Sequence, residues 1–178
     1  MNNLIKGMLM CAIINEMHAF TLMSRAFGPS ETIPSLYTCD GANQSPPLAW
    51  KNAPKNTKSL ALICEDPDAP TPQPFVHWII GNIPASATQL SEKLPTTEKL
   101  ENGTVQGRND AHKTGYYGPC PPSGNHHYHF TLYALESMLQ LTQPVTKDML
   151  LNAMQGHIIA QTTLIGTYQK RNKHVKRT

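Results

Sequence analysis

The sequence lacks several features that would assign it to common classes of protein. No stretch of 18 apolar residues occurs in the 178-residue chain, so the sequence predicts no membrane-spanning helix. No Cys-x-x-Cys pair is present, which argues against a structural zinc site, and no internal repeat is visible. Charged residues make up only 15%, whereas proline is abundant with 15 residues. This mixture is typical of a loop-rich, mainly β protein and not of a disordered or coiled-coil chain.

The net charge of +3 comes from the C-terminal end of the chain. Five of the 15 basic residues lie within residues 170–178, which form a basic tail. The rest of the chain carries ten basic against twelve acidic residues, a net charge of −2. We therefore expect a solvated tail and no nucleic-acid partner.

The first 19 residues allow more than one interpretation. A lysine followed by the apolar run 8–14 is similar to a short secretory signal, although polar residues interrupt it early. The alternatives are an N-terminal extension or a true start near Met17. We expect residues 20–169 to form one domain of a cytoplasmic protein, or of a periplasmic one if residues 1–19 act as a signal peptide.

Two apolar runs, 60–64 and 76–80, predict buried strands at the centre of a sheet. Between them lies the sequence Asp66-Pro67-Asp68-Ala69-Pro70. Its prolines fix φ and lack N–H donors, so the first strand must end there. His77 lies in the second run. Two carboxylates and an imidazole at strand ends, on stiff backbone, predict a preorganised polar pocket. The alternative is a proline-rich turn with solvated aspartates.

A second polar cluster, His126-His127-Tyr128, opens the clearest alternating segment of the chain, 128–135. Side chains two residues apart share one face of a strand, so His126 and Tyr128 point together and His127 points away. We expect the inward pair to meet the first cluster in one cavity, with the loop 115–122 as its lip.

The remaining elements are predicted to be short strands and one helix. Thr146 is expected to cap that helix at its N-terminus, and the helix ends at Gly156 or at Ala160. Residues 162–168 return to extended structure. Because short strands dominate, we expect a mainly antiparallel sheet.

Two of the four cysteines, Cys39 and Cys120, lie in loops rich in proline and glycine. They could form a disulfide if the fold brings their Cα atoms within about 7 Å. Cys64 lies in the first apolar run and is expected to be a buried, inert side chain.

These motifs resemble the phosphatidylethanolamine-binding protein family, and in particular its bacterial Raf kinase inhibitor-like branch. The motifs that carry the resemblance are Asp66-Pro-Asp-Ala-Pro70, His77-Trp78, Gly115-Tyr-x-Gly-Pro-Cys-Pro-Pro122 and Gly124-x-His126-x-Tyr128. The resemblance spans about residues 20–169. It implies a large central antiparallel sheet, a smaller second sheet and one or two flanking helices.

The resemblance also implies a pocket for phosphate or phosphorylated head groups. Carried over by position, its lining would be Asp66, Pro70, His77, Pro121, His126 and Tyr128, with Asp68 supporting it from behind. The chain departs from the family pattern at His127, where arginine is usual. Histidine offers neither a permanent charge nor a bidentate fork, so a weaker tie of the neighbouring loop is expected.

The chemistry of this residue set suits an anion. Two imidazoles and a phenol can donate hydrogen bonds to phosphate oxygens, and the carboxylates can orient the imidazoles. We therefore predict a non-enzymatic binding protein with no cofactor and no metal, whose ligand is a small phosphorylated or anionic molecule. Two kinds of protein partner are left open by the sequence. One is a kinase or protease that the protein inhibits, and the other is a second copy of the chain in a homodimer.

The alternative function is a hydrolase that uses the same cluster of histidines and aspartates. It would need a metal ion held by His77, His126 and a carboxylate, or Cys120 as a nucleophile. No helical HExxH-type spacing supports the metal, and the thiol would need a depressed pKa.

Overall fold

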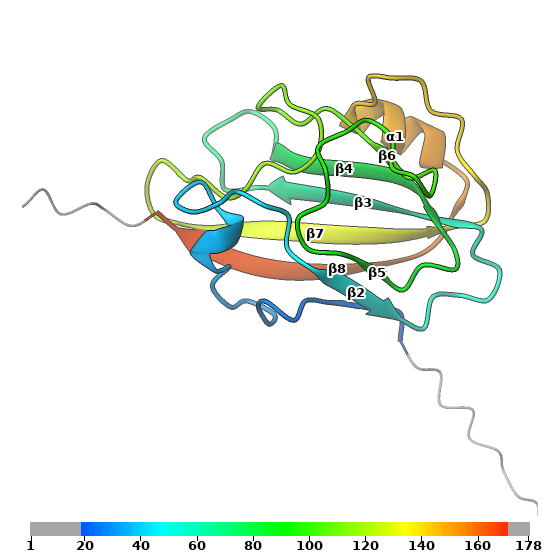
Figure 1. Cartoon of the computed structure of the whole chain (residues 1–178), viewed down its shortest axis with the longest axis horizontal. Helices are drawn as coiled ribbons and strands as arrows, with labels where there is room; N and C mark the ends of the chain where they lie inside the picture. The colour runs from blue at the N-terminus through cyan, green and yellow to red at the C-terminus, as the bar shows by residue number, and fades with distance from the viewer. Residues whose placement is uncertain (1–18, 171–178) are drawn as a thin grey trace, which may run out of the picture.

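The computed structural model describes residues 19–170 as two antiparallel β-sheets and one α-helix (Figure 1). The larger sheet has the strand order β6-β4-β3-β7-β8, and the smaller one the order β1-β2-β5. The larger sheet contains β3 (Ser59–Asp66), β4 (Phe75–Pro84), β6 (Val105–Gln106), β7 (Asn125–Leu135) and β8 (Ile158–Gln169). The smaller sheet contains β1 (Thr21–Met23), β2 (Leu48–Lys51) and β5 (Gln89–Leu90). The predicted mainly β fold with a large and a small sheet is confirmed.

Strand β3 lies in the middle of the larger sheet, between β4 and β7, and is buried on both faces. Leu60, Leu62 and Cys64 belong to the core that includes the smaller sheet. Ala61 and Ile63 belong to a second core. Burial on both faces explains why β3 reads as a continuous apolar run instead of an alternating one.

The second core lies under the helix α1 (Lys147–Met154), which contributes Leu150 and Met154 to it. The predicted N-cap is confirmed, because the Thr146 hydroxyl accepts a hydrogen bond from the Met149 N–H at 3.3 Å. The helix stops before Gly156, whose φ is +79°. The alternative end at Ala160 is wrong, since β8 has already begun at Ile158.

The register between β3 and β7 decides where the polar residues lie. Glu65 is paired with His129, so β7 begins four residues before that pair and runs beyond the end of β3. The first residues of β7 therefore lie beside the turn that follows β3. This arrangement brings His126 next to Asp66.

A disulfide joins the loop that follows the short 3-10 helix η1 (Ser35–Tyr37) to the loop that precedes β7. It links Cys39 and Cys120, whose Cα atoms are 5.3 Å apart. From the second of these loops, the Tyr116 hydroxyl donates to the carbonyl of Tyr37, the last residue of η1, at 2.8 Å. The sequence left open whether these cysteines pair, and the structure shows that they do. The predicted burial of Cys64 is confirmed, and it is a free thiol.

Two predictions, the signal-like N-terminal segment and the solvated basic tail, concern the two ends of the chain. The N-terminal segment 1–19 and the basic tail 170–178 lie outside the described residues, apart from Ala19 and Lys170. Within residues 19–170, no helix combines the length and the apolar character needed to cross a bilayer.

We expect Phe130→Ala to lower the free energy of unfolding by about 3–5 kcal/mol, because it leaves a cavity in a fully buried site. Phe130 is 0% exposed, and its ring lies 5.7 Å from that of Phe27. Thr163→Ala is the control on the neighbouring strand. It removes a hydrogen bond between exposed hydroxyls of Thr131 and Thr163, and should cost about 1 kcal/mol or less. Urea unfolding followed by tryptophan fluorescence measures both, and equal losses would contradict the expectation.

Replacement of both Cys39 and Cys120 by serine is expected to lower the free energy of unfolding by about 3–4 kcal/mol, because a long loop is no longer closed in the unfolded chain. The two residues are 81 positions apart. The same measurement on the parent protein with a dithiol reductant should give a similar loss, while the double variant should not respond to the reductant. A double variant as stable as the oxidised parent would contradict this expectation.

Candidate functional site

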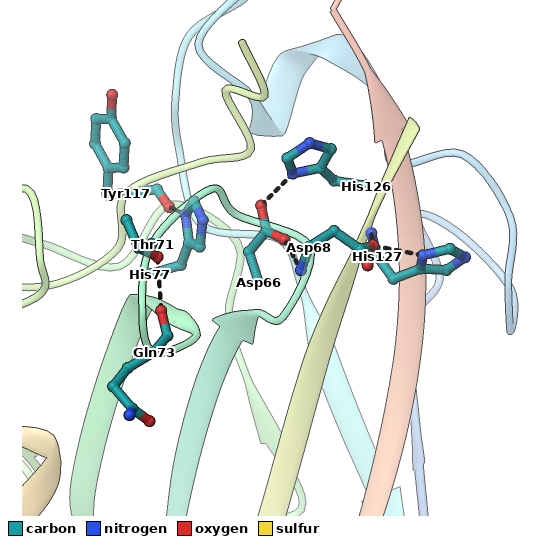
Figure 2. Close-up of polar contacts among 8 residues, drawn as sticks. All are labelled: Asp66, Asp68, Thr71, Gln73, His77, Tyr117, His126 and His127. Carbon is teal, nitrogen blue, oxygen red and sulfur yellow. Dashed lines mark hydrogen bonds and ion pairs between the residues drawn. The ribbon is translucent and has the colours of Figure 1, made fainter. Parts of the chain in front are cut away.

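The candidate site lies at one end of the larger sheet. Strand β3 ends there at Asp66, and its two antiparallel neighbours begin there, β4 at Phe75 and β7 at Asn125. The turn after Asp66 holds prolines at 67, 70, 72 and 74, which cannot continue the ladder of hydrogen bonds. Side chains from distant parts of the sequence therefore meet where the sheet stops (Figure 2).

A cavity of about 210 Å³ opens among these strand ends. Five of the predicted residues line it: Asp66, Pro70, His77, Pro121 and His126. The remaining lining includes Thr71, Phe75, Tyr117, Cys120 and Pro122. The disulfide thus forms part of the wall through Cys120.

Asp66 and His126 form a buried pair at the centre of the site. The carboxylate is 3% exposed and the histidine 8%. The Asp66 Oδ2 lies 2.8 Å from the His126 Nδ1, and its Oδ1 accepts the Asp68 N–H at 2.9 Å. Figure 2 shows both contacts. Because a carboxylate only accepts, Nδ1 of His126 carries the hydrogen.

His77 is held on the other side of Asp66 by the backbone of Tyr117. Its Nδ1 lies 2.6 Å from the Tyr117 carbonyl oxygen, and the Tyr117 N–H donates back to the His77 carbonyl at 2.9 Å. The His77 and Tyr117 rings are stacked at 5.8 Å. Burial lowers the pKa of His77, although the Tyr117 carbonyl and the Asp66 charge act in the opposite direction.

Tyr128, predicted to line the cavity, lies beneath it instead. The residue is fully buried, and its ring meets the His77 ring edge-on at 5.1 Å. The hydroxyl lies near the Asp66 carboxylate, but in a geometry that makes no hydrogen bond. Burial and then the Asp66 charge raise the pKa of Tyr128, so the phenol stays neutral. His77 covers it, which strand alternation alone could not predict.

Asp68 lies outside the cavity, on the solvent side of the turn. Its Oδ2 accepts two hydrogen bonds from His127, from the backbone N–H at 2.8 Å and from Nδ1 at 2.7 Å. These bonds lower the pKa of Asp68. As predicted, His127 points away from His126. The His127 side chain therefore links the turn to β7 through a single hydrogen bond from Nδ1, whereas an arginine could donate two.

Sequence reasoning missed the two aromatic residues of the lining, Phe75 and Tyr117. The Phe75 ring lies 4.9 Å from that of His77. A signal for Phe75 was available, because it precedes His77 by two positions in one strand and so shares its face. Tyr117 belongs to the predicted lip, but nothing in the sequence indicated its contact with His77.

The structure also bears on the two versions of the hydrolase alternative. The sulfur of Cys120 is bonded to that of Cys39, so residue 120 offers no free thiol as a nucleophile. Within residues 19–170, no group of three or more histidine, cysteine, aspartate or glutamate side chains is placed to hold a metal ion.

Relatives of known sequence cover almost the whole described part of the chain. Residues 23–169 match the family model of the phosphatidylethanolamine-binding proteins. A UPF0098 protein of Methanothermobacter thermautotrophicus is 50% identical over 149 residues, which are 84% of this chain and 98% of that relative. A UPF0098 protein of Chlamydia pneumoniae is 44% identical over 153 residues, with the same two shares.

Two solved structures agree with these matches. The structure of CT736 from Chlamydia trachomatis has a TM-score of 0.80 at 42% identity, covering 86% of this chain and 99% of that one. The structure of YbcL from Escherichia coli has a TM-score of 0.76 at 33% identity, covering 85% and 99%. The family that the motifs predicted is therefore confirmed: the chain belongs to the phosphatidylethanolamine-binding protein family.

Proposed function

We propose that the protein is a non-enzymatic binding protein whose cavity beside Asp66, His77 and His126 holds a phosphate group or a phosphorylated head group. Membership of the family supports a binding protein. The observation that carries the finer proposal is the buried Asp66–His126 pair on the cavity wall. It offers an imidazole to a ligand together with a carboxylate that compensates its charge.

The orientation of His126 suits an anion. Its Nδ1 is engaged by Asp66, while its Nε2 makes no hydrogen bond within the described part of the chain. In the protonated ring, Nε2–H donates to a ligand oxygen, and a charge-assisted hydrogen bond of this kind is stronger than a neutral one. Little water reaches this residue, which strengthens the attraction further.

The size and the lining of the cavity favour a head group over an acyl chain. About 210 Å³ holds a phosphate ester with a short substituent. Phe75, Pro70 and Pro121 give it one apolar side, against which the carbon atoms of such a substituent can pack. In ethanolamine phosphate, the ammonium group could also donate to Asp66. Inhibition of a kinase or protease is a separate possibility raised by the resemblance, and ligand binding does not require it.

We expect His126→Ala to weaken the binding of inorganic phosphate and of phosphoethanolamine by about 10- to 100-fold, because a charged hydrogen bond is lost. Calorimetric titration near pH 6 measures both affinities. His157→Ala is the control, because His157 lies at the opposite end of the sheet beside Glu136 and touches no cavity residue. It should bind as the parent does.

Two results would contradict the proposal. One is the absence of binding of either ligand to the parent protein. The other is equal affinity of the parent and of a His126→Ala variant that is shown by circular dichroism to be folded.

A further inference from the structure

The hydrogen position on His77 follows from its contact with Tyr117. The Tyr117 carbonyl oxygen, 2.6 Å from Nδ1, can only accept a hydrogen bond. Nδ1 therefore carries the hydrogen, and in a neutral ring Nε2 is left with a lone pair and no hydrogen. This Nε2 has no hydrogen-bond partner within residues 19–170, and His77 lines the cavity. His77 thus presents an acceptor to a ligand, contrary to the donor role predicted from the sequence.

The surroundings of His77 keep its ring neutral near neutral pH. The residue is 3% exposed and packed among the rings of Phe75, Tyr117 and Tyr128. The charged or titratable groups that act on it are Asp66 from β3, Asp110 from the loop before Tyr117, and His126 from β7. Burial is the largest influence and lowers the pKa of His77, and His126 acts in the same direction. The two aspartates oppose this shift without cancelling it.

The rest of the cavity offers few hydrogen-bond donors. Three lining residues are prolines, which have no N–H: Pro70, Pro121 and Pro122. The Thr71 hydroxyl donates to the Gln73 carbonyl at 2.6 Å (Figure 2), and its N–H donates to the Ala69 carbonyl. Beside the protonated His126 ring and the Tyr117 hydroxyl, the lining thus presents two acceptors on neighbouring side chains, the Asp66 carboxylate and the His77 Nε2.

We propose that this pocket selects oxyanions that carry a hydrogen, such as hydrogen phosphate, over fully deprotonated ones such as sulfate, because His77 and Asp66 accept a hydrogen bond from the ligand. The inference rests on the proposed function and names the class of anion within it. A ligand without a hydrogen leaves two buried acceptors facing its negative oxygens. A protonated phosphoryl group donates to one of them and accepts from His126.

The neutral state of His77 can be tested without a ligand. Because the pKa of His77 is lower in the folded than in the unfolded protein, the unfolded histidine takes up its proton first as the pH falls below about 7, and stability falls with it. The folded and unfolded populations should shift by up to about tenfold per pH unit from this group alone. In His77→Phe the contribution of this group to the dependence of stability on pH disappears. Identical slopes in urea unfolding of the parent and this variant would overturn the proposal.

The direct test is calorimetric titration of the parent protein with inorganic phosphate, methyl phosphate and sulfate, in buffers free of other oxyanions. Near pH 7 inorganic phosphate carries a hydrogen, and we expect it to bind at least about tenfold more tightly than sulfate. Near pH 5.5 both phosphates carry a hydrogen. Near pH 8 methyl phosphate has lost its hydrogen, whereas inorganic phosphate keeps one, so the ratio of their affinities should rise in favour of inorganic phosphate. A change in the charge of the protein itself acts on both ligands alike and does not alter this ratio.

The outcomes separate this inference from the function on which it rests. Sulfate binding as tightly as inorganic phosphate near pH 7, or an affinity ratio of the two phosphates that does not change with pH, would overturn the requirement for a hydrogen but not anion binding. No binding of any of the three ligands would overturn both. In His77→Phe the preference for phosphate over sulfate should fall by at least about threefold, because Asp66 alone is left to accept the hydrogen, while the control His157→Ala keeps the preference of the parent.

Discussion

The Asp66 carboxylate holds together the polar end of the molecule. A buried carboxylate is costly unless its oxygens are hydrogen-bonded. Here one oxygen accepts the Asp68 N–H and the other accepts from the His126 Nδ1. The first contact shapes the turn after β3, and the second fixes the first residues of β7. The shape of the turn and the orientation of the imidazole are therefore set by the same charge.

Much of the fold could be predicted because burial leaves a regular pattern in the sequence. β3 was visible as a continuous apolar run and β7 as an alternating one. The end of α1 was less clear, because Ile158 continues the apolar stripe of the helix into β8. The backbone leaves the helical conformation at Gln155, with ψ 125°, and Gly156 follows with a positive φ. A pattern of side chains alone does not reveal that choice.

The candidate site shows where prediction from the sequence stops. Alternation along β7 correctly separated His126 and Tyr128 from His127, since it depends only on the period of a strand. It could not show how deep each side chain lies, so Tyr128 was expected in the lining although His77 covers it. Nor could it show which nitrogen of His77 carries the hydrogen. That depends on a carbonyl group 40 residues further along the chain.

The prolines around the cavity have an effect beyond their lack of N–H groups. Pro70, Pro121 and Pro122 line the cavity with a fixed φ, and the disulfide links Cys120 of the lining to Cys39. Walls of this kind have little conformational freedom to lose when a ligand arrives. For the binding proposed above, the entropy lost on association is then mainly that of the ligand itself, because the chain around the cavity needs no ordering.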